Sequence, residues 1–244
     1  MTTKPYSALA PVYEKVMRGT EYDRWAEYLV SLLKEYANGK SGLDMACGSG
    51  FFTRVIKREG YQIEGVDLSD DMLNQALNVS RKEGLNIPFR KGDMTSFKNF
   101  SKVDFITVIN DGINYVEPTK LLKTFKNFYS LLKKDGVLLF DISSEYKLKN
   151  VIANNVFSED EEDMTYVWFN KLYEDKVEMD ISVFIKDGDR YVKKEESQIE
   201  YIHTLNSIVD LLQKSGYKTV IAQNFGGGEV RKDSLRIQFI AKKN

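Results

Sequence analysis

The chain has 244 residues, of which 42% are hydrophobic and 29% are charged, and this length suffices to bury the core of one α/β domain with an insertion. Its 35 lysine and arginine residues nearly balance its 36 aspartate and glutamate residues, so no overall charge field attracts nucleic acid or an anionic membrane. The single cysteine, Cys47, excludes an internal disulfide, and no apolar run approaches the about 20 residues that span a bilayer.

The N-terminal segment lacks the apolar stretch of a signal peptide, so we expect a cytoplasmic protein. Its apolar residues fall on one helical face over 6–17, and a second pattern of this kind covers 22–33. Because Pro11 and Gly19 interrupt the pattern, the sequence predicts two short helices instead of one long helix. We expect both helices to pack on the main sheet.

A buried strand is expected at 42–46, followed by a glycine turn and a helix over 51–58. Gly48 and Gly50 in this turn allow backbone angles that other residues avoid, and they let main chain approach a ligand. The next strand, at 62–66, ends in Asp67, whose carboxylate can accept both hydroxyls of a ribose. The segment therefore predicts a β-α-β unit that binds an adenosine.

Two nucleotide-binding patterns are incomplete here. The third glycine of a dinucleotide fingerprint is missing, because Phe51 and Phe52 follow the turn directly. The Gly-Lys-Ser/Thr sequence of a phosphate-binding loop is also absent. The pattern thus favours an adenosine without a tightly held phosphate.

Further strand-like runs alternate with helical patterns along the rest of the chain. The strands are expected at 87–91, 103–109, 136–142, 217–222 and 235–241, and the helical patterns include 121–132 and 205–212. This alternation predicts a mostly parallel sheet of seven strands that is flanked by helices on both faces. Gly84, Gly136 and Gly216 each follow a helical pattern and are predicted to form left-handed C-terminal caps.

Residues 155–202 break this alternation. Runs at 164–173 and 177–185, a turn at 186–189 and a further strand after it predict an inserted antiparallel sheet of about three strands. One face of this sheet is expected to be apolar and the other wet. The acidic run 158–163 is expected to be a solvated loop, with cation or acceptor binding as the alternative.

Two polar segments follow strands of the main sheet. Arg90 to Met94 closes the third strand, and at the carboxyl edge of a parallel sheet it would lie beside a ligand crevice. Asn110 to Tyr115 follows the fourth strand, where contacts to an acceptor are expected. For both segments a simple turn is the alternative.

These segments resemble a known family. Leu43 to Thr53 match the motif Leu-Asp-x-(Ala/Gly)-Cys-Gly-x-Gly-x-x-Thr of the class I S-adenosylmethionine-dependent methyltransferases. The loop at 110–116 is similar to that of bacterial small-molecule methyltransferases and amino-sugar N-methyltransferases. The resemblance implies a Rossmann-like α/β fold with a seven-stranded sheet, mostly parallel, whose last strand is antiparallel.

The predicted organisation has two parts. Residues 1–154 and 203–244 would form the cofactor-binding methyltransferase core, with a helical lid at 1–37. Residues 155–202 would form the inserted antiparallel β subdomain on the acceptor side, because the cofactor half-site already occupies 42–115.

The resemblance also implies roles for single residues. Tyr6 and Tyr13 would lie over the cofactor in a Tyr-x-x-x-Ala-x-x-Tyr-Asp lid, in which Glu14 replaces the aspartate. A tyrosine ring facing a sulfonium gains about 0.5 to 2 kcal/mol. Asp93 would accept a hydrogen bond from the adenine amino group, and the Met94 backbone would contact a ring nitrogen. The predicted cofactor-binding residues are Tyr6, Tyr13, Ala46, Gly48, Ser49, Gly50, Asp67, Leu68, Met72, Asp93, Met94 and Asn110.

Methyl transfer is an in-line displacement that needs the nucleophile about 3 to 3.5 Å from the methyl carbon, with water excluded. A positioned base helps a hydroxyl or a protonated acceptor. Asp111 is the first candidate for orienting or deprotonating the acceptor, and Tyr115 is the second. His203, the one histidine, is the third, although a lone histidine at such a junction is more often structural. Cys47 is expected to pack in the turn, and no metal-ligand spacing occurs, so we expect no metal.

We therefore predict an S-adenosylmethionine-dependent methyltransferase that acts on nitrogen or oxygen of a small-molecule acceptor. We expect a monomer or homodimer, no membrane partner, and no nucleic-acid partner because of the charge balance. Three alternatives stay open. They are an RNA methyltransferase with a basic stripe, a nicotinamide-dependent oxidoreductase, and a non-catalytic cofactor-binding module that lacks an acceptor pocket.

Overall fold

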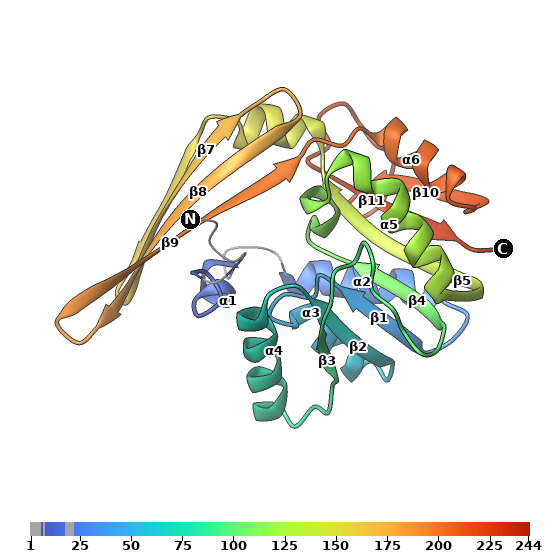
Figure 1. Ribbon diagram of the computed structural model, residues 1–244, viewed down its shortest axis with the longest axis horizontal. Coiled ribbons are helices and arrows are strands. Elements are labelled where there is room, and N and C mark those ends of the chain that lie inside the picture. Colours follow the sequence, from blue (N-terminus) through green and yellow to red (C-terminus); the bar gives the residue numbers. More distant parts are fainter. Residues whose placement is uncertain (1–5, 7, 18–21) are drawn as a thin grey trace.

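A computed structural model describes residues 6, 8–17 and 22–244 of the protein. A seven-stranded sheet with helices on both faces forms the main body, and a long four-stranded sheet extends from one side of it (Figure 1). The helix α1 (Tyr13–Val16) lies between the two sheets. The first residues of the predicted lid and its interruption at Gly19 lie outside the described residues.

The main sheet contains the seven strands that the sequence predicts. These are β1 (Ser41–Met45), β2 (Gln62–Asp67), β3 (Phe89–Lys91), β4 (Val103–Val108), β5 (Leu132–Ser143), β10 (Thr219–Asn224) and β11 (Arg236–Lys242). They lie in the order β10-β11-β5-β4-β1-β2-β3, and β11, the last strand, runs antiparallel to both of its neighbours. This confirms the predicted fold. The strand order reverses between β1 and β4, and ligands of such sheets bind beyond the carboxyl ends at that point.

Helices cover both faces of the main sheet. They are α2 (Tyr22–Tyr36), α3 (Phe51–Arg58), α4 (Asp70–Lys82), α5 (Pro118–Leu131) and α6 (Leu205–Lys214), with two short helices, η2 (Gly112–Tyr115) and η3 (Lys147–Ile152). Successive residues of β4 point to opposite faces, so Phe105 packs with α2 and α3 whereas Ile106 packs with α5 and α6. Within the described ranges, no helix is both long and apolar enough to cross a membrane.

Two of the three predicted glycine caps are confirmed. Gly84 follows α4 with a φ of 69°, and Gly216 follows α6 with a φ of 107°. The prediction for Gly136 is wrong, because β5 begins directly after α5 and the left-handed residue is Asp135, with a φ of 61°. Close packing of β5 on β4 favours glycine at position 136, since a Cβ atom there would come within 3.1 Å of the Asp104 carbonyl oxygen on β4.

The inserted sheet has four antiparallel strands instead of the expected three. They are β6 (Val156–Glu161), β7 (Met164–Leu172), β8 (Lys176–Asp187) and β9 (Arg190–Tyr201), in the order β6-β7-β8-β9. The expectation of a loop at 158–163 is wrong, because β6 reaches Glu161 and pairs with β7 along its whole length. As an edge strand, β6 exposes acidic side chains that discourage pairing with another molecule. The acidic composition of this segment therefore suggested a loop where the chain forms a strand.

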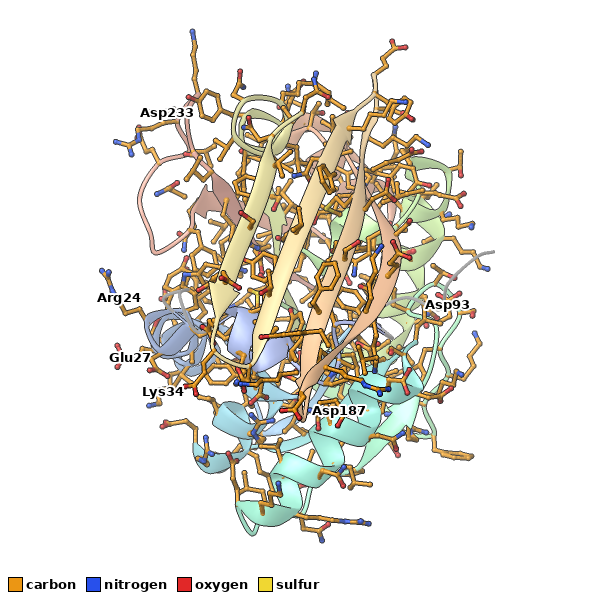
Figure 2. All side chains as sticks on the ribbon, turned by 90° about the vertical axis from the view of Figure 1, so that its left-hand side faces the viewer. Arg24, Glu27, Lys34, Asp93, Asp187 and Asp233 are labelled. Atoms are coloured by element: carbon orange, nitrogen blue, oxygen red, sulfur yellow. The ribbon has the colours of Figure 1, made fainter. Side chains whose placement is uncertain are left out.

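The predicted turn between β8 and β9 is confirmed. The two strands join through a two-residue turn in which Gly188 has a φ of 62°, and Asp187 lies at the tip of this hairpin (Figure 2). Alternate side chains of β8 are buried on one face of the inserted sheet, as expected. Both predicted N-terminal helices form, but only α2 packs on the main sheet. The segment 8–17 packs on the inserted sheet through Leu9 and Val12.

Candidate active site

The crevice beyond the carboxyl ends of β1, β2 and β4 contains a cavity of about 350 Å³, called the first cavity below. Most of the predicted cofactor-binding residues line it. These are Tyr6, Tyr13, Ala46, Gly48, Ser49, Asp67, Leu68, Met72, Met94 and Asn110. The predicted residues Gly50 and Asp93 do not line this cavity.

The loop after β1 has a left-handed backbone at three residues, Ala46, Gly48 and Gly50, with φ of 55°, 54° and 78°. A Cβ atom on Gly48 would have no neighbour within 4 Å, so the main chain faces open space there. Gly50 lies behind the loop, where a Cβ atom would come within 3.0 Å of Ala76 on α4. Gly48 therefore lets a ligand approach the main chain, and Gly50 lets α4 approach the loop.

Asp67 at the end of β2 lies opposite this loop. One carboxylate oxygen accepts a hydrogen bond from the Gly48 N–H at 2.8 Å, and the other accepts one from the Ser69 N–H at 2.9 Å. Burial raises the pKa of Asp67, and these backbone hydrogen bonds act in the opposite direction. Each oxygen keeps a lone pair for a ribose hydroxyl, which is the role that the sequence predicts.

Asp93 and Met94 follow β3 but differ in position. Met94 is buried and lines the first cavity. Asp93 is exposed at the periphery of the molecule (Figure 2), and its carboxylate accepts a hydrogen bond from the Thr95 N–H at 2.8 Å. This contact forms a local turn. The pairing of Asp93 with an adenine amino group stays a prediction.

The N-terminal segment is tied to the main body at the first cavity. The rings of Tyr6 and Tyr13 meet edge to face, with 5.9 Å between their centroids. Tyr13 Oη accepts a hydrogen bond from Asn110 Nδ2 at 3.1 Å. Glu14, which replaces the aspartate of the lid pattern, pairs with Arg54 on α3 at 2.9 Å. The segment is thus fixed to the loop after β4 and to α3.

Glu196 on β9 holds the same segment from the inserted sheet. Its Oε2 accepts hydrogen bonds from the backbone N–H groups of Ala8 at 2.8 Å and Leu9 at 3.3 Å. Glu196 is buried, and burial raises its pKa. A carboxylate buried in this way needs these two amide donors.

A second cavity, of about 310 Å³, lies among the N-terminal segment, η3 and the inserted sheet. It shares a wall with the first cavity, formed by Tyr6, Tyr13, Asn110, Tyr115 and Gln198. Apolar and aromatic residues form most of the remaining lining, namely Leu9, Val16, Met17, Trp25, Ile152, Phe157, Tyr166, Trp168, Met179 and Ile181. The polar end of the second cavity consists of Asp111, Lys147, Glu200 and Arg236.

Known proteins share both sequence and fold with this chain. The methyltransferase domain family matches residues 43–136, from β1 into β5. A provisionally assigned methyltransferase of Geobacillus sp. (strain WCH70) is 30% identical over 245 residues, which cover 98% of this chain and 99% of that protein. The chain belongs to the methyltransferases.

The crystal structure of an S-adenosylmethionine-dependent methyltransferase from Clostridium acetobutylicum ATCC 824 is 31% identical to this methyltransferase. The two structures superpose with a TM-score of 0.87, and the match covers 97% of this chain and 98% of the Clostridium chain. These matches confirm the class I fold and S-adenosylmethionine as the cofactor, and they set aside the nicotinamide-dependent interpretation. The sugar N-methyltransferase KedS8 from Streptoalloteichus sp. ATCC 53650 shares the fold at 18% identity, with a TM-score of 0.77 and 95% and 92% of the two chains covered.

The first cavity of this methyltransferase fits the cofactor. Asp67 offers acceptors for ribose hydroxyls, and the open space beside Gly48 admits a ligand next to the main chain. The rings of Tyr6, Tyr13 and other aromatic residues line the same cavity and can face a sulfonium.

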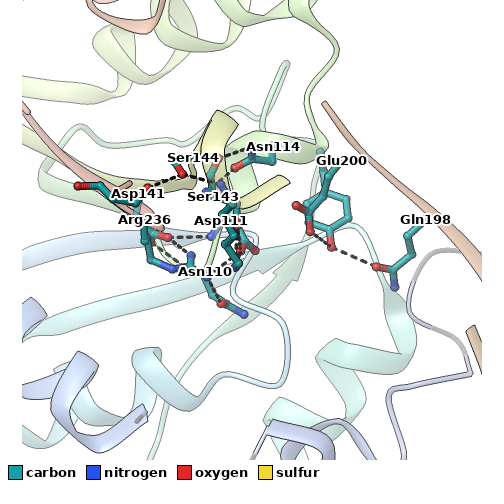
Figure 3. Close-up of polar contacts among 12 residues, drawn as sticks. Asn110, Asp111, Asn114, Asp141, Ser143, Ser144, Gln198, Glu200 and Arg236 are labelled. Atoms are coloured by element: carbon teal, nitrogen blue, oxygen red, sulfur yellow. Dashed lines mark hydrogen bonds and ion pairs between the residues drawn. The ribbon is translucent and has the colours of Figure 1, made fainter. Parts of the chain in front are cut away.

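Asp111, the first candidate base of the methyltransferase, belongs to a buried ion-pair network (Figure 3). Its carboxylate accepts hydrogen bonds from Ser143 Oγ and Arg236 Nη2, both at 2.8 Å, and Lys147 Nζ lies 3.9 Å away. Burial acts to raise the pKa of Asp111, but Arg236 and Lys147 outweigh it and hold this pKa below its ordinary value. A carboxylate paired in this way is a weak proton acceptor, so the geometry favours a positioning role.

Asp141 on β5 holds the loop that carries Asp111. Its carboxylate accepts hydrogen bonds from the N–H groups of Asn110 at 2.8 Å and Asp111 at 3.0 Å, and it also pairs with Arg236 (Figure 3). Asn110 and Asp111 have φ of 63° and 54°, in the left-handed region that asparagine and aspartate enter more readily than other non-glycine residues. The polar loop after β4 is therefore fixed by a residue that the sequence does not single out.

Tyr115, the second candidate, lies at the junction of the two cavities. Its Oη accepts a hydrogen bond from Tyr6 Oη at 2.7 Å. The same hydroxyl can donate to Gln198 Oε1 at 3.1 Å or to Glu200 Oε1 at 3.3 Å. Burial raises the pKa of Tyr115 well above its ordinary value, so the phenol stays protonated at neutral pH. It can orient an acceptor but does not readily remove a proton.

His203 and Cys47 take no part in the lining of the second cavity. The Nε2 atom of His203 lies 3.1 Å from the Val116 carbonyl oxygen, and burial lowers the pKa of this imidazole. This is the structural role that a lone histidine more often has. Cys47 lines the first cavity, but burial raises the pKa of its thiol well above the ordinary value, which disfavours a nucleophilic thiolate.

Several residues of the site were missed from the sequence. Glu196, Gln198 and Glu200 occupy alternate positions of β9 and are all buried. The sequence does not distinguish them, because the neighbouring Glu195 and Ser197 are also polar, and only burial separates the two faces of the strand. For Lys147 and Arg236, no local pattern distinguishes a buried site residue from a surface cation.

Proposed function

We propose that this methyltransferase moves the methyl group of S-adenosylmethionine to a nitrogen or oxygen atom of a small-molecule acceptor. The observation that carries this proposal is the wall shared by the two cavities. In-line displacement needs the reacting atoms about 3 to 3.5 Å apart, and adjoining cavities allow a cofactor and an acceptor to approach in this way.

In this proposal the first cavity holds the cofactor, with Asp67 at the ribose and Gly48 next to the ligand. When bound, S-adenosylmethionine supplies an electrophilic methyl group on a positively charged sulfur. Tyr6 and Tyr13 can stabilise this charge through their ring faces. Because both tyrosines also line the second cavity, they help to exclude water from the path between the two ligands.

The size and lining of the second cavity support a small-molecule acceptor. Its volume of about 310 Å³ is in the range of small-molecule sites, and aromatic and aliphatic side chains form most of its walls. An RNA acceptor brings a chain of phosphates that basic side chains must neutralise, whereas this chain has a net charge of -1. The charge balance therefore supports the smaller acceptor.

We assign recognition of the acceptor to the inserted region 155–202. Each of its four strands contributes to the lining of the second cavity, through Phe157 on β6, Trp168 on β7, Ile181 on β8 and Glu200 on β9. The rest of the chain then forms the cofactor-binding core. The predictions of a cytoplasmic monomer or homodimer stay predictions, which cell fractionation and light scattering can test.

Calorimetric titration with S-adenosylmethionine, S-adenosylhomocysteine and NAD tests cofactor binding. Binding of S-adenosylmethionine and S-adenosylhomocysteine but not of NAD supports the proposal. If neither sulfur ligand binds, the proposal is overturned. Transfer of radiolabelled methyl groups to a panel of amines, sugars and phenols then tests the acceptor class. Label entering only an RNA oligonucleotide would replace the small-molecule acceptor. Cofactor binding without transfer to any class would favour the non-catalytic module.

A further inference from the structure

Among the described residues, the polar end of the second cavity contains one carboxylate without an ion-pair partner. Asp111 and Asp141 both pair with Arg236, and Lys147 lies 3.9 Å from Asp111. Glu200 reaches the same cavity from β9 (Figure 3), yet it forms no ion pair with the residues that the structure describes. This carboxylate is the group that the network leaves unmatched.

Within the part of the chain that the structure describes, the Glu200 side chain has one hydrogen-bond partner, the Tyr115 hydroxyl. Tyr115 Oη lies 3.3 Å from its Oε1, and only 7% of the residue surface is exposed. Because Tyr115 also lines the first cavity, Glu200 is separated from the cofactor site by one side chain. A buried carboxylate costs free energy unless a cation or a proton joins it. Without a ligand, Glu200 meets this cost by holding a proton, and a cation that enters the cavity can take the place of that proton.

We propose that Glu200 binds a protonated amine in the second cavity and accepts the proton that its nitrogen must lose before methyl transfer. The inference rests on the proposed function, since it names the acceptor class and the proton acceptor of that same site.

The charge balance of the cavity favours an amine over a hydroxyl acceptor. When ionised, the lining residues Asp111 and Glu200, together with the fully buried Asp141 that pairs with Arg236 but does not line the cavity, bring three negative charges, whereas Arg236 and Lys147 bring two positive charges. An ammonium group supplies the missing positive charge, and a hydroxyl does not. The tyrosine and tryptophan rings of this cavity also attract cations.

The ionisation of Glu200 is suited to proton exchange near neutral pH. The other charged or titratable groups that act on it are Asp111, Lys147, Arg236, Tyr115 and Tyr6. Burial first, and the negative charge of Asp111 second, raise the pKa of Glu200 to about 8, while the two cations and the Tyr115 hydroxyl act to lower it. A general base works best when its pKa is close to the working pH.

The chemical step balances with these groups alone. An ammonium nitrogen gives one proton to the Glu200 carboxylate, which frees its lone pair. The lone pair forms the bond to the methyl carbon while the carbon–sulfur bond breaks and its electrons return to sulfur. The positive charge thus moves from sulfur to the methylated nitrogen, and the Glu200 carboxylic acid afterwards releases its proton to water.

Benzylamine and benzyl alcohol test the proposal, because they share one apolar body and differ in charge. We expect benzylamine, and not benzyl alcohol, to bind the complex with S-adenosylhomocysteine and to accept label from S-adenosylmethionine. In the Glu200→Gln variant, transfer to benzylamine at pH 7 should fall by about 100-fold or more. Affinity for S-adenosylhomocysteine should stay near that of the wild type.

The pH dependence separates a proton acceptor from a structural residue. The loss of transfer rate in Glu200→Gln, relative to the wild type, should become smaller as the pH is raised, because the amine then loses its proton to solvent. A deficit of equal size at every pH would overturn the proposal. The matched control is Glu195→Gln, the neighbouring glutamate on the outer face of β9, whose side chain is 65% exposed. It should keep the wild-type rate and pH profile.

Failure of the two proposals can be told apart. If S-adenosylhomocysteine does not bind, the proposed function fails and the role of Glu200 fails with it. If it binds but benzyl alcohol is preferred, or neither probe is accepted, the role of Glu200 with amines is overturned while the proposed function stands for other acceptors.

Discussion

The hydroxyl of Tyr6 donates a hydrogen bond of 2.7 Å to the hydroxyl of Tyr115, 109 residues further along the chain. The contact joins the N-terminal segment to the loop after β4. Because both residues line both cavities, it fixes the wall across which a methyl group would pass. Cofactor binding and methyl transfer should therefore both depend on it.

Replacing Tyr115 by phenylalanine removes this hydroxyl and keeps the ring. We expect affinity for S-adenosylhomocysteine to fall by about 0.5 to 1.5 kcal/mol, the usual net contribution of a hydrogen bond. Methyl transfer should fall further, because the hydroxyl also contacts Gln198 and Glu200. Calorimetry and label transfer measure the two effects.

The control for this prediction is Tyr166→Phe. Tyr166 also lines the second cavity, but its hydroxyl contacts Glu159 on the exposed strand β6 at 3.2 Å. Equal losses in the two variants would show that the Tyr115 hydroxyl has no special place in the shared wall.

Replacing Asp67 by alanine should weaken cofactor binding by about 1 to 3 kcal/mol, because charge-assisted hydrogen bonds are lost. Calorimetric titration with S-adenosylmethionine measures the change. Asp70→Ala is the control, since this carboxylate pairs with Lys91 and is 53% exposed. Wild-type affinity in Asp67→Ala would remove Asp67 from the cofactor site.

Replacing Asp111 by asparagine should leave cofactor binding intact while methyl transfer slows, because Arg236 and the loop after β4 lose an anchor. The free energy of unfolding should fall by about 3 kcal/mol, as expected when one member of a buried ion pair is removed. Urea denaturation and label transfer measure the two effects. If neither stability nor transfer changes, the role of Asp111 in the network is wrong.

The Asp111 contribution to stability should disappear in acid. Its folded-state pKa is lowered, so the stabilisation is present above the unfolded-state value of about 3.9 and is lost as the pH falls through the folded-state pKa. The stability difference between the wild type and Asp111→Asn should therefore be full at pH 7 and shrink below about pH 4. Denaturation series at several pH values test this, and a constant difference would argue against the ionised pair.

Replacing Glu196 by alanine removes both hydrogen bonds to the Ala8 and Leu9 amides. Hydrogen bonds to a charged group contribute about 1.5 to 3 kcal/mol each, so the segment 8–17 should open more often. Hydrogen exchange of these two amides should accelerate, whereas exchange in β1 should not change. Glu195→Ala on the outer face is the control, and unchanged exchange in Glu196→Ala would mean that other contacts hold the segment.

The main fold and the cavity of the proposed cofactor site could be predicted because their parts are local in sequence. The glycine loop, the helix after it and Asp67 belong to one β-α-β unit, and the strands and helices around them follow clear apolar periods. Even there, one position that depends on close packing was predicted wrongly. Gly136 lies in β5 and not at a helix cap, and the approach of β4 leaves no room for a Cβ atom there.

The sequence by itself therefore determined the family of the fold and brought together the parts of the proposed cofactor site, because short-range patterns encode both. Only the tertiary structure revealed the second cavity, which we propose as the acceptor site. The acidic edge strand β6 is stabilised by pairing with β7, a long-range interaction that outweighs its loop-like composition. Four separate elements supply the charged residues of this cavity, Asp111, Lys147, Glu200 and Arg236. Their charges interact strongly only because folding brings them together and removes the water that would screen them.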